Sequence, residues 1–352
     1  MKIPATPIEW ADNHIRIIDQ TLLPAELQII EVRTAAAAVA AINRLAIRGA
    51  PALGAFGALA LVVGLDETAP PTLEKAITRL EELRTFIGNA RPTAANLQWA
   101  VDRVIDRALS SSETLDSLRA ALLEEAHKVA EEDAAACQEI GRLGHELLRY
   151  AATIGTHCNA GRLATAGIGT ALAPMYVKAK AGESLRVLAS ETRPLLQGAR
   201  LTAWELADAG IDVTVLPDAA MASQVLSGQV DAYIVGADRI AANGDTANKV
   251  GTVTHALAAR EADIPFYVAA PTSTIDPALP SGDHIEIEQR DEREVHEIQG
   301  KRITPEGVHA ANPAFDVTPG TLITAIITEV GVLRAPFQDS IADALVRAGA
   351  SR

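Results

Sequence analysis

A change of rhythm at Ala151 constrains the fold of this 352-residue chain more than any other feature. From there, short apolar runs rich in β-branched residues alternate with helical patterns. The expected strands are Ala152–Gly155, Leu185–Ala189, Val213–Leu216, Ala232–Val235 and Phe266–Ala270. The expected helices are Leu163–Lys180, Pro194–Ala209, Ala219–Leu226 and Asn248–Glu261. This alternation is typical of an α/β fold whose mainly parallel sheet is covered on both faces, and ligands of such sheets bind at the carboxyl ends of the strands.

The first 150 residues have a different pattern. Two short strands, Ile15–Ile18 and Gln28–Val32, are expected within residues 1–34, and helical patterns dominate after them. These patterns cover Thr34–Ile47, Pro51–Val63, Pro71–Ile87, Pro92–Leu109 and about Glu113 to Tyr150. A proline fits the first turn of a helix, where its missing N–H costs nothing. We therefore predict a mostly helical N-terminal domain with a short β-containing start (residues 1–125), a connecting helix (126–150) and an α/β domain (151–352).

Composition narrows the classes of function. The net charge is −14, which argues against a general nucleic-acid surface because such a surface needs a basic footprint. An anionic substrate remains compatible, since a few arginines and backbone N–H groups suffice to bind phosphate. Two cysteines form no disulfide framework. Without the pattern of a signal peptide, and with an apolar run at 50–65 interrupted by Pro51 and glycines, we expect a cytoplasmic protein with no membrane contact.

Two motif-like features carry little weight. Gly167–Leu172 begins as a dinucleotide fingerprint but ends in leucine and lies within a helical pattern, so glycine-mediated helix packing is the better interpretation. Gly49–Gly54 has the spacing of a phosphate loop but lacks its lysine and hydroxyl residue. The eight histidines are scattered, and no metal site is expected.

The run from Thr156 to Gly161 places Cys158 on a turn between an apolar run and a helical pattern. A thiol near a helix N-terminus has a lowered pKa and is reactive. The alternative is a small buried hydrophobe at a strand end. The other cysteine, Cys137, lies in a helical stretch and is expected to fill space there.

A carboxyl group follows the fourth expected strand. Asp238 lies in the apolar run Val235–Ile240, where burial would raise its pKa and make it a general acid. The alternative is a surface turn in which Asp238 pairs with Arg239.

Two more strand-end segments carry candidate ligands. Gln197, in Glu191–Gly198, would face a ligand from the first helical turn, unless that segment is only a capped helix start. Asn248 and Lys249 lie where a helix is expected to begin, and a lysine is unfavourable there unless an anion is bound. The alternative is a solvated loop with a turn at Asn243-Gly244.

In the N-terminal half, Arg48 and Arg91 each stand shortly before a proline-started helix, in Arg48-Gly49-Ala50-Pro51 and Asn89-Ala90-Arg91-Pro92. Together with helix N-terminal amides, the two arginines would clamp a phosphate. A single arginine of this kind would be a solvated residue by default.

Together these residues resemble the methylthioribose-1-phosphate isomerase family, over nearly the whole chain. The matching segments are Asp19–Pro24, Arg48–Gly54, Ala90–Leu97, Thr156–Thr165, Glu191–Leu206, Val235–Thr252, Pro265–Asp276 and Asn312–Thr328. The wider superfamily includes regulatory subunits of translation initiation exchange factor 2B and archaeal ribose-1,5-bisphosphate isomerase. In having both Cys158 and Asp238, the chain resembles the isomerase branches of this superfamily.

The resemblance implies a Rossmann-like C-terminal domain and a homodimer. It implies conversion of 5-methylthioribose 1-phosphate to 5-methylthioribulose 1-phosphate in methionine salvage, without a cofactor. It implies that Cys158 and Asp238 are the catalytic pair. The residues implied to hold phosphate and sugar hydroxyls are Arg48, Gly49, Ala50, Arg91, Gln197, Asn248 and Lys249.

Two departures from the family pattern bear on the substrate. Ser190 stands where an aspartate is usual, and Arg162 where alanine is commoner. They leave the reaction type intact and open a close alternative, an isomerase of 5-deoxyribose 1-phosphate. A regulatory protein of the translation branch is a second alternative, since it would share the fold without catalysis. A nicotinamide-linked dehydrogenase is a third, and the broken glycine fingerprint weighs against it.

Overall fold

The computed structural model describes residues 6–91 and 95–349, which form two compact units. Of the described residues, those from 6 to 138 and from 162 to 169 form the helical unit. The α/β unit comprises residues 139–161 and those from 170 onward. Residues 162–169 therefore pack with the helical unit, although they lie inside the stretch that the sequence assigns to the second domain.

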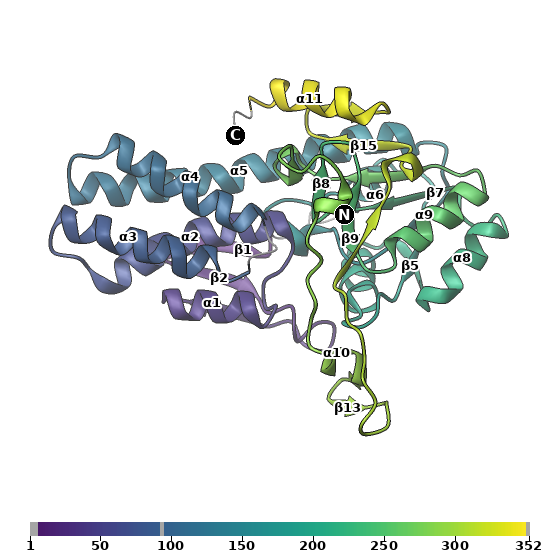
Figure 1. The fold of residues 1–352 in the computed structure, drawn as a ribbon, viewed down its shortest axis with the longest axis horizontal. Helices are drawn as coiled ribbons and strands as arrows, with labels where there is room; N and C mark the ends of the chain where they lie inside the picture. Colours follow the sequence, from purple (N-terminus) through teal and green to yellow (C-terminus); the bar gives the residue numbers. More distant parts are fainter. Residues whose placement is uncertain (1–5, 92–94, 350–352) are drawn as a thin grey trace. The chain divides into compact units, whose positions relative to one another are not determined.

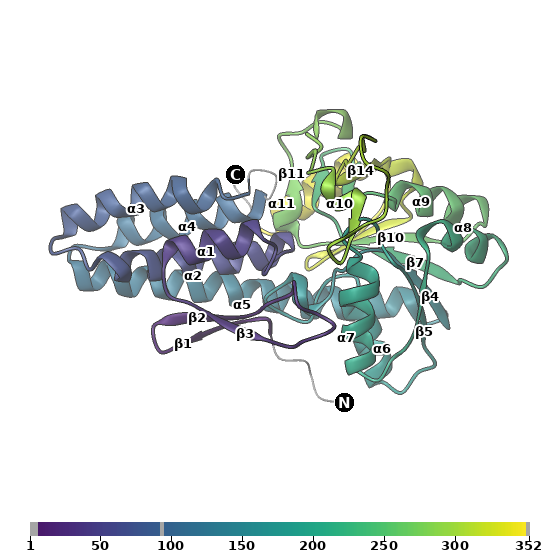
Figure 2. The ribbon, with the colours of Figure 1, turned by 90° about the horizontal axis from the view of Figure 1, so that it is seen from below.

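The helical unit combines a small sheet with long helices (Figures 1 and 2). Strands β1 (Ile8–Ala11), β2 (His14–Ile18) and β3 (Ile29–Val32) form an antiparallel sheet in that order. The helices are α1 (Ala35–Asn43), α2 (Ala50–Thr68), α3 (Leu73–Gly88), α4 (Ala95–Ser111) and the first part of α5 (Leu115–Leu148). Their apolar faces share one core centred on α2. The expected strands and helices of this half are present, whereas β1 was not expected; Pro92 lies outside the described residues.

Helix α2 is the core helix of this unit. Of the described helices, it alone is long and apolar enough to cross a membrane, and 83% of its apolar window is buried inside the protein. Pro51 lies in its first turn, as expected. The helix expected at Pro51–Val63 is present but longer, because it continues to Thr68.

Gly49 precedes α2 with φ +94°, and a Cβ there would lie 2.5 Å from the carbonyl oxygen of Ala164. We expect Gly49→Ala to destabilise the protein by about 2–4 kcal/mol, because backbone strain adds to a clash with main-chain atoms. Gly182→Ala is the matched control, since Gly182 has φ +73° with nothing within 4 Å and only the strain applies. Urea unfolding of both variants checks this, and equal midpoints would contradict it.

The α/β unit is built on a seven-stranded sheet in the order β16-β15-β10-β7-β4-β5-β6. Its strands are β4 (Thr153–Thr156), β5 (Arg186–Ser190), β6 (Asp212–Leu216), β7 (Ala232–Val235), β10 (Phe266–Ala269), β15 (Ala325–Thr328) and β16 (Gly331–Leu333). Every neighbouring pair is parallel except β15 with the edge strand β16. From β4, the chain winds outward through β5 and β6 and then restarts at β7 on the other side. The fold is therefore the expected Rossmann-like α/β fold, and its strand order reverses between β4 and β7.

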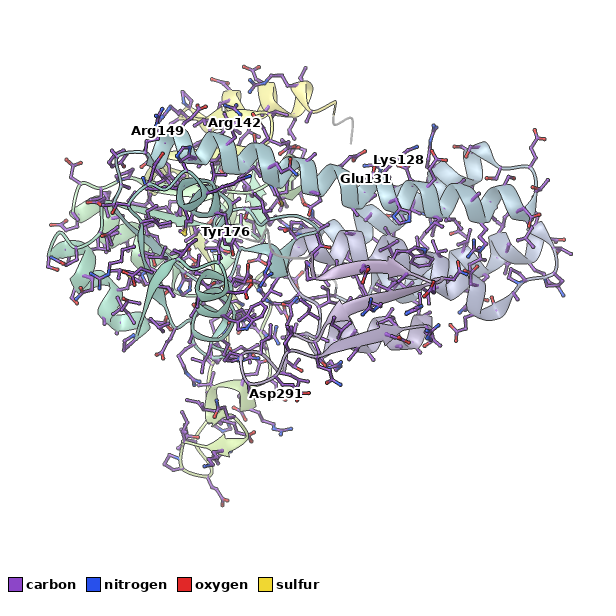
Figure 3. The ribbon with its side chains drawn as sticks, turned by 180° about the vertical axis from the view of Figure 1, so that it is seen from behind. Lys128, Glu131, Arg142, Arg149, Tyr176 and Asp291 are labelled. Carbon is purple, nitrogen blue, oxygen red and sulfur yellow. The ribbon has the colours of Figure 1, made fainter. Side chains whose placement is uncertain are left out.

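Helices cover this sheet on both faces. Figure 2 shows α6 (Ala173–Lys180) on one side and α8 (Asp218–Leu226) and α9 (Thr252–Glu261) on the other. The remaining helices are α7 (Ala203–Asp208), α10 (Arg293–His296) and α11 (Phe337–Arg347). The last turns of α5 also belong to this unit, with Arg142 on them and Arg149 just beyond (Figure 3).

A second sheet lies beyond the carboxyl ends of the main strands. It contains β11 (Ile275–Asp276), β8 (Arg239–Ala241), β9 (Thr246–Lys249) and β14 (Phe315–Thr318) in that order. Between β11 and β14 the chain makes an excursion through α10 and the hairpin of β12 (Glu297–Ile298) and β13 (Lys301–Arg302), visible at the bottom of Figure 1. None of these short strands was expected.

Three of the expected helices of the α/β unit were wrong in extent. Only Ala173–Lys180 of the first is helical, since the preceding residues turn through Gly167 and Gly169. The second consists of a π-turn at Gly198–Thr202 and the short α7. The helix expected at Asn248–Glu261 begins only at Thr252, because Asn248 and Lys249 belong to β9. Gly167 nevertheless packs against α5, where a Cβ would lie 2.9 Å from the Cβ of Cys137.

Candidate functional site

Cys158 and Asp238 follow the two strands between which the strand order reverses. Cys158 is two residues beyond β4, and Asp238 is three residues beyond β7. The two loops are in close contact, since a Cβ on Gly236 would lie 2.7 Å from the Cβ of Ala160. In open parallel sheets, the crevice at this reversal is where ligands bind. The structure therefore brings the thiol and the carboxyl to the edge where the sequence leads us to expect function.

Cys158 occupies an unusual backbone conformation. Its φ is +60°, in the left-handed region that non-glycine residues rarely adopt, and its side chain is half-buried. The expected neighbouring helix N-terminus is absent, because residues 162–169 form turns and α6 begins only at Ala173. The helix-dipole argument for a reactive Cys158 was therefore wrong. Contacts other than a helix N-terminus must hold the backbone of Cys158 in its left-handed conformation.

Asp238 is half-buried and stands between two sheets. Its N–H donates to the carbonyl of Ala247 at 2.9 Å, which ties the end of β7 to β9. The alternative of a surface turn pairing Asp238 with Arg239 was wrong, since Arg239 forms its ion pair with Asp276 at 3.3 Å. The backbone of Asp238 is thus held beside the strand that carries Asn248 and Lys249.

Asn248 and Lys249 are buried on β9. The Lys249 ammonium donates to the carbonyl of Ala314 at 2.7 Å and lies 4.4 Å from the centre of the Phe315 ring. The Asn248 amide donates to the Thr252 hydroxyl at 3.1 Å. A buried lysine is costly without such partners. The alternative of a solvated loop was wrong: the chain does turn at Asn243-Gly244, where Gly244 has φ +87°, but Gly244 is buried against Phe337.

The N-terminus of α9 already holds an anion, which is a side chain of this protein. The Asp316 carboxylate accepts the N–H groups of Gly251 at 2.6 Å and Val253 at 3.2 Å. Burial raises the pKa of Asp316 to about 6, although these donors and Lys249 act to lower it. The expectation of a ligand anion at a helix start carrying Lys249 was therefore wrong in its geometry. No local sequence pattern marks Asp316. It lies opposite Asn248 only because β14 pairs with β9.

Gln197 lies on the turn after β5 and is 7% exposed. Its side-chain oxygen is buried and has no hydrogen-bond partner among the described residues. Leaving such a buried oxygen unpaired costs free energy, and a ligand that donates a hydrogen bond to it removes that cost. This favours a ligand-facing Gln197 over an ordinary helix start.

A buried histidine pair lies directly behind the Cys158 loop. His157 lies 2.9 Å from the carbonyl of Val250 through Nε2, which must donate, so Nδ1 is the acceptor. That Nδ1 lies 2.5 Å from the Ser190 hydroxyl and 3.2 Å from Nε2 of His255. Burial lowers the pKa of His157 to about 4 and that of His255 to about 3, so both rings are neutral at pH 7. The sequence does not predict this pair, because two histidines 98 positions apart carry no joint signal.

The other expected ligands belong to the helical unit. Arg48 is buried just before α2, Gly49 is its N-cap, and Ala50 is its first residue. Arg91 is half-buried. Arg162 is also in this unit and is buried in a 3₁₀ turn, Arg162–Ala164. Among residues 6–91 and 95–349, no group of three or more His, Cys, Asp or Glu side chains is arranged to hold a metal ion.

Known proteins match this chain over most of its length. The family model described as the initiation factor 2 subunit family matches residues 46–335. A 5-deoxyribose 1-phosphate isomerase from Moorella thermoacetica is 49% identical over 99% of both chains. A methylthioribose-1-phosphate isomerase from Citrifermentans bemidjiense is 49% identical over 94% of this chain and 96% of its own.

A solved structure agrees with these relatives. It is that of 5-methylthioribose 1-phosphate isomerase from Pyrococcus horikoshii, which is 41% identical and superimposes with a TM-score of 0.91. The match covers 98% of this chain and 96% of the other. The chain therefore belongs to the initiation factor 2 subunit family, in its methylthioribose-1-phosphate isomerase branch, and it is an isomerase of phosphorylated sugars.

Proposed function

We propose that this isomerase converts 5-methylthioribose 1-phosphate to 5-methylthioribulose 1-phosphate in methionine salvage, with Cys158 and Asp238 as its catalytic residues. One observation carries the proposal: the two side chains follow adjacent strands, β4 and β7, at the reversal of strand order. The named activities of relatives that are 49% identical support the substrate class.

The proposed chemistry follows from the substrate. Phosphate on C1 prevents spontaneous opening of the furanose ring, so an acid must act on the ring oxygen. Asp238 donates a proton to O4 as the C1–O4 bond breaks. Cys158, as thiolate, takes the proton from C2 and returns it to C1, while the C2 hydroxyl gives its proton to the Asp238 carboxylate and becomes the ketone. The substrate and product are isomers, so no external oxidant or reductant is required.

The remaining assignments are proposals drawn from the resemblance. Gln197, Asn248 and Lys249 of the α/β unit, and Arg48, Gly49, Ala50 and Arg91 of the helical unit, are proposed to bind the phosphate and hydroxyl groups. The buried side-chain oxygen of Gln197, which has no hydrogen-bond partner among the described residues, supports this for the first set. The protein is further proposed to act as a cytoplasmic homodimer without a cofactor.

A substrate panel tests the function. Ketose formation is measured with the 1-phosphates of 5-methylthioribose, 5-deoxyribose and ribose, and the highest kcat/KM is expected for the first. The Moorella relative favours 5-deoxyribose 1-phosphate as the second candidate. A tenfold preference for that compound would establish the second candidate. Absence of turnover on all three would favour the non-catalytic alternative, a regulatory protein of the translation branch.

Isotope incorporation tests the proton-transfer step. In heavy water, we expect deuterium at C1 of the product, because a proton held by Cys158 exchanges with solvent before it reaches C1. Nuclear magnetic resonance of the product measures this. A product without deuterium at C1 would favour a direct hydride shift from C2 to C1 and remove Cys158 from the proton transfer.

A further inference from the structure

Two residues at the candidate site have backbones that require external support. Cys158 has φ +60° and Thr192, on the loop after β5, has φ +66°. The left-handed region costs a non-glycine residue about 1–2 kcal/mol, and a β-branched residue such as threonine is a stronger outlier there. Strain of this kind persists only where surrounding contacts hold it.

Two hydroxyl groups hold the backbone of Cys158 from both sides. The N–H of Cys158 donates to Oγ1 of Thr192 at 2.9 Å. The carbonyl of Cys158 accepts from Oγ1 of Thr202 at 2.6 Å. The peptide groups before and after the Cys158 Cα are therefore both fixed, so its backbone dihedrals cannot relax without breaking a buried hydrogen bond. Both threonines are fully buried.

The Thr192 hydroxyl is itself locked in place. The carboxylate of Asp218 accepts the N–H groups of Thr192 and Arg193, each at 2.7 Å. The hydroxyl donates to the carbonyl of Ser190 at 3.0 Å, which leaves its oxygen to accept from Cys158.

The Thr202 hydroxyl is locked from the other side. It accepts from the amide of Asn159 at 3.1 Å, and the same amide donates to Glu205 at 2.8 Å. Glu205 is fully buried, and its second oxygen accepts from the hydroxyl of Tyr176 at 2.9 Å, a residue labelled in Figure 3. Because Thr202 has a single proton and accepts from Asn159, that proton goes to the Cys158 carbonyl.

We infer that Thr192 and Thr202 are positioning residues that hold Cys158 in its left-handed conformation and so fix the direction in which its thiol leaves the backbone. This inference rests on the proposed catalytic role of Cys158. Without the two hydroxyls, the strained residue relaxes toward negative φ and its side chain changes direction. Displacement of a reacting atom by about 1 Å costs roughly 100-fold in rate.

Isosteric replacement tests this. Thr202→Val and Thr192→Val remove the hydroxyl and keep the shape, and each should lower kcat by roughly 30–100-fold with KM within threefold of the parent. Thr202→Ser and Thr192→Ser keep the hydroxyl and should retain kcat within about threefold. Thr328→Val is the matched control, since Thr328 is equally buried and donates to the carbonyl of Gly331 at 2.9 Å, away from Cys158. Crystal structures of the valine variants should show a negative φ at Cys158.

A double variant shows whether the threonines act through Cys158. Adding Thr202→Val to Cys158→Ser should cause less than a threefold further loss, because the group being positioned is already gone. The inference is overturned if both valine variants keep kcat within threefold, or if the serine variants lose as much as the valine variants. Should a valine variant fail to fold, the serine variants and the other threonine decide by the same criterion. Full activity in Cys158→Ser alone would instead overturn the proposed function.

Discussion

Cys158→Ser and Asp238→Asn should each lower kcat by at least 100-fold, and by up to about 10⁴-fold. The serine hydroxyl keeps the position of the thiol but is far less acidic, so it forms no anion that can take the C2 proton. The asparagine keeps the shape of the aspartate but cannot donate a proton to the ring oxygen. Steady-state ketose formation from the preferred substrate measures both effects.

Cys137→Ala is the matched control for the thiol. Cys137 is buried on α5, and burial raises the pKa of its thiol far above the usual range. Its replacement should leave kcat within threefold, with any cost appearing in stability. Near-normal turnover in both Cys158→Ser and Asp238→Asn would remove the two residues from the chemistry, whatever the substrate.

Stability should fall steeply between pH 6.5 and pH 4. His157 and His255 are neutral when folded, with pKa values lowered by burial to about 4 and about 3, whereas both have an ordinary pKa near 6.5 when unfolded. Their stabilising contribution is therefore complete above pH 6.5 and is lost as the pH falls. In this range the unfolded chain binds protons at both histidines, whereas the folded chain does not. Each histidine contributes a slope of roughly 1 kcal/mol per pH unit in this window. The urea midpoint, measured from pH 4.5 to 7.5, should drop accordingly.

The titration of Asp316 changes stability with pH in the direction opposite to that of the two histidines. Burial raises its folded pKa to about 6, above its unfolded value, so it takes up a proton on folding and opposes the histidine effect between about pH 6 and pH 4. Asp316→Asn should therefore steepen the loss of stability on acidification. His255→Phe keeps a ring to stack on Tyr233, 5.2 Å away, and should flatten the loss because one titrating group is gone. Identical slopes in the parent and both variants would contradict this assignment.

Five of the seven strands of the main sheet could be predicted, because each contains a short apolar run; β15 and β16 were not expected. Ala232–Val235 was predicted with its observed bounds. The strands of the second sheet could not be predicted in this way. β9 contains Thr246, Ala247, Asn248 and Lys249, a polar run that becomes a strand only because Ala247 and its neighbours pair with β8 and β14. The assignment of Asn248 and Lys249 to a helix followed local propensity, which tertiary pairing overrode.

The activation expected for Cys158 failed for a related reason. The small residues from Ala160 onward have the composition of a helix start, but Gly167 packs on α5 and Gly169 adopts φ +98°, so the chain turns instead. The hydroxyls of Thr192 and Thr202 that hold Cys158 lie 34 and 44 positions away. Nothing local to Cys158 could indicate them.

By itself, the sequence determined the α/β alternation, the helical first half, and the expectation that Cys158 and Asp238 end apolar strands, because hydrophobic periodicity and turn residues act over a few positions. Only the tertiary structure decided that β4 and β7 are neighbours, that Asp316 occupies the start of α9, and that His157 and His255 share a buried contact. Each of these depends on which distant strands pair and on which polar groups burial forces together, and neither is encoded in any short stretch of chain.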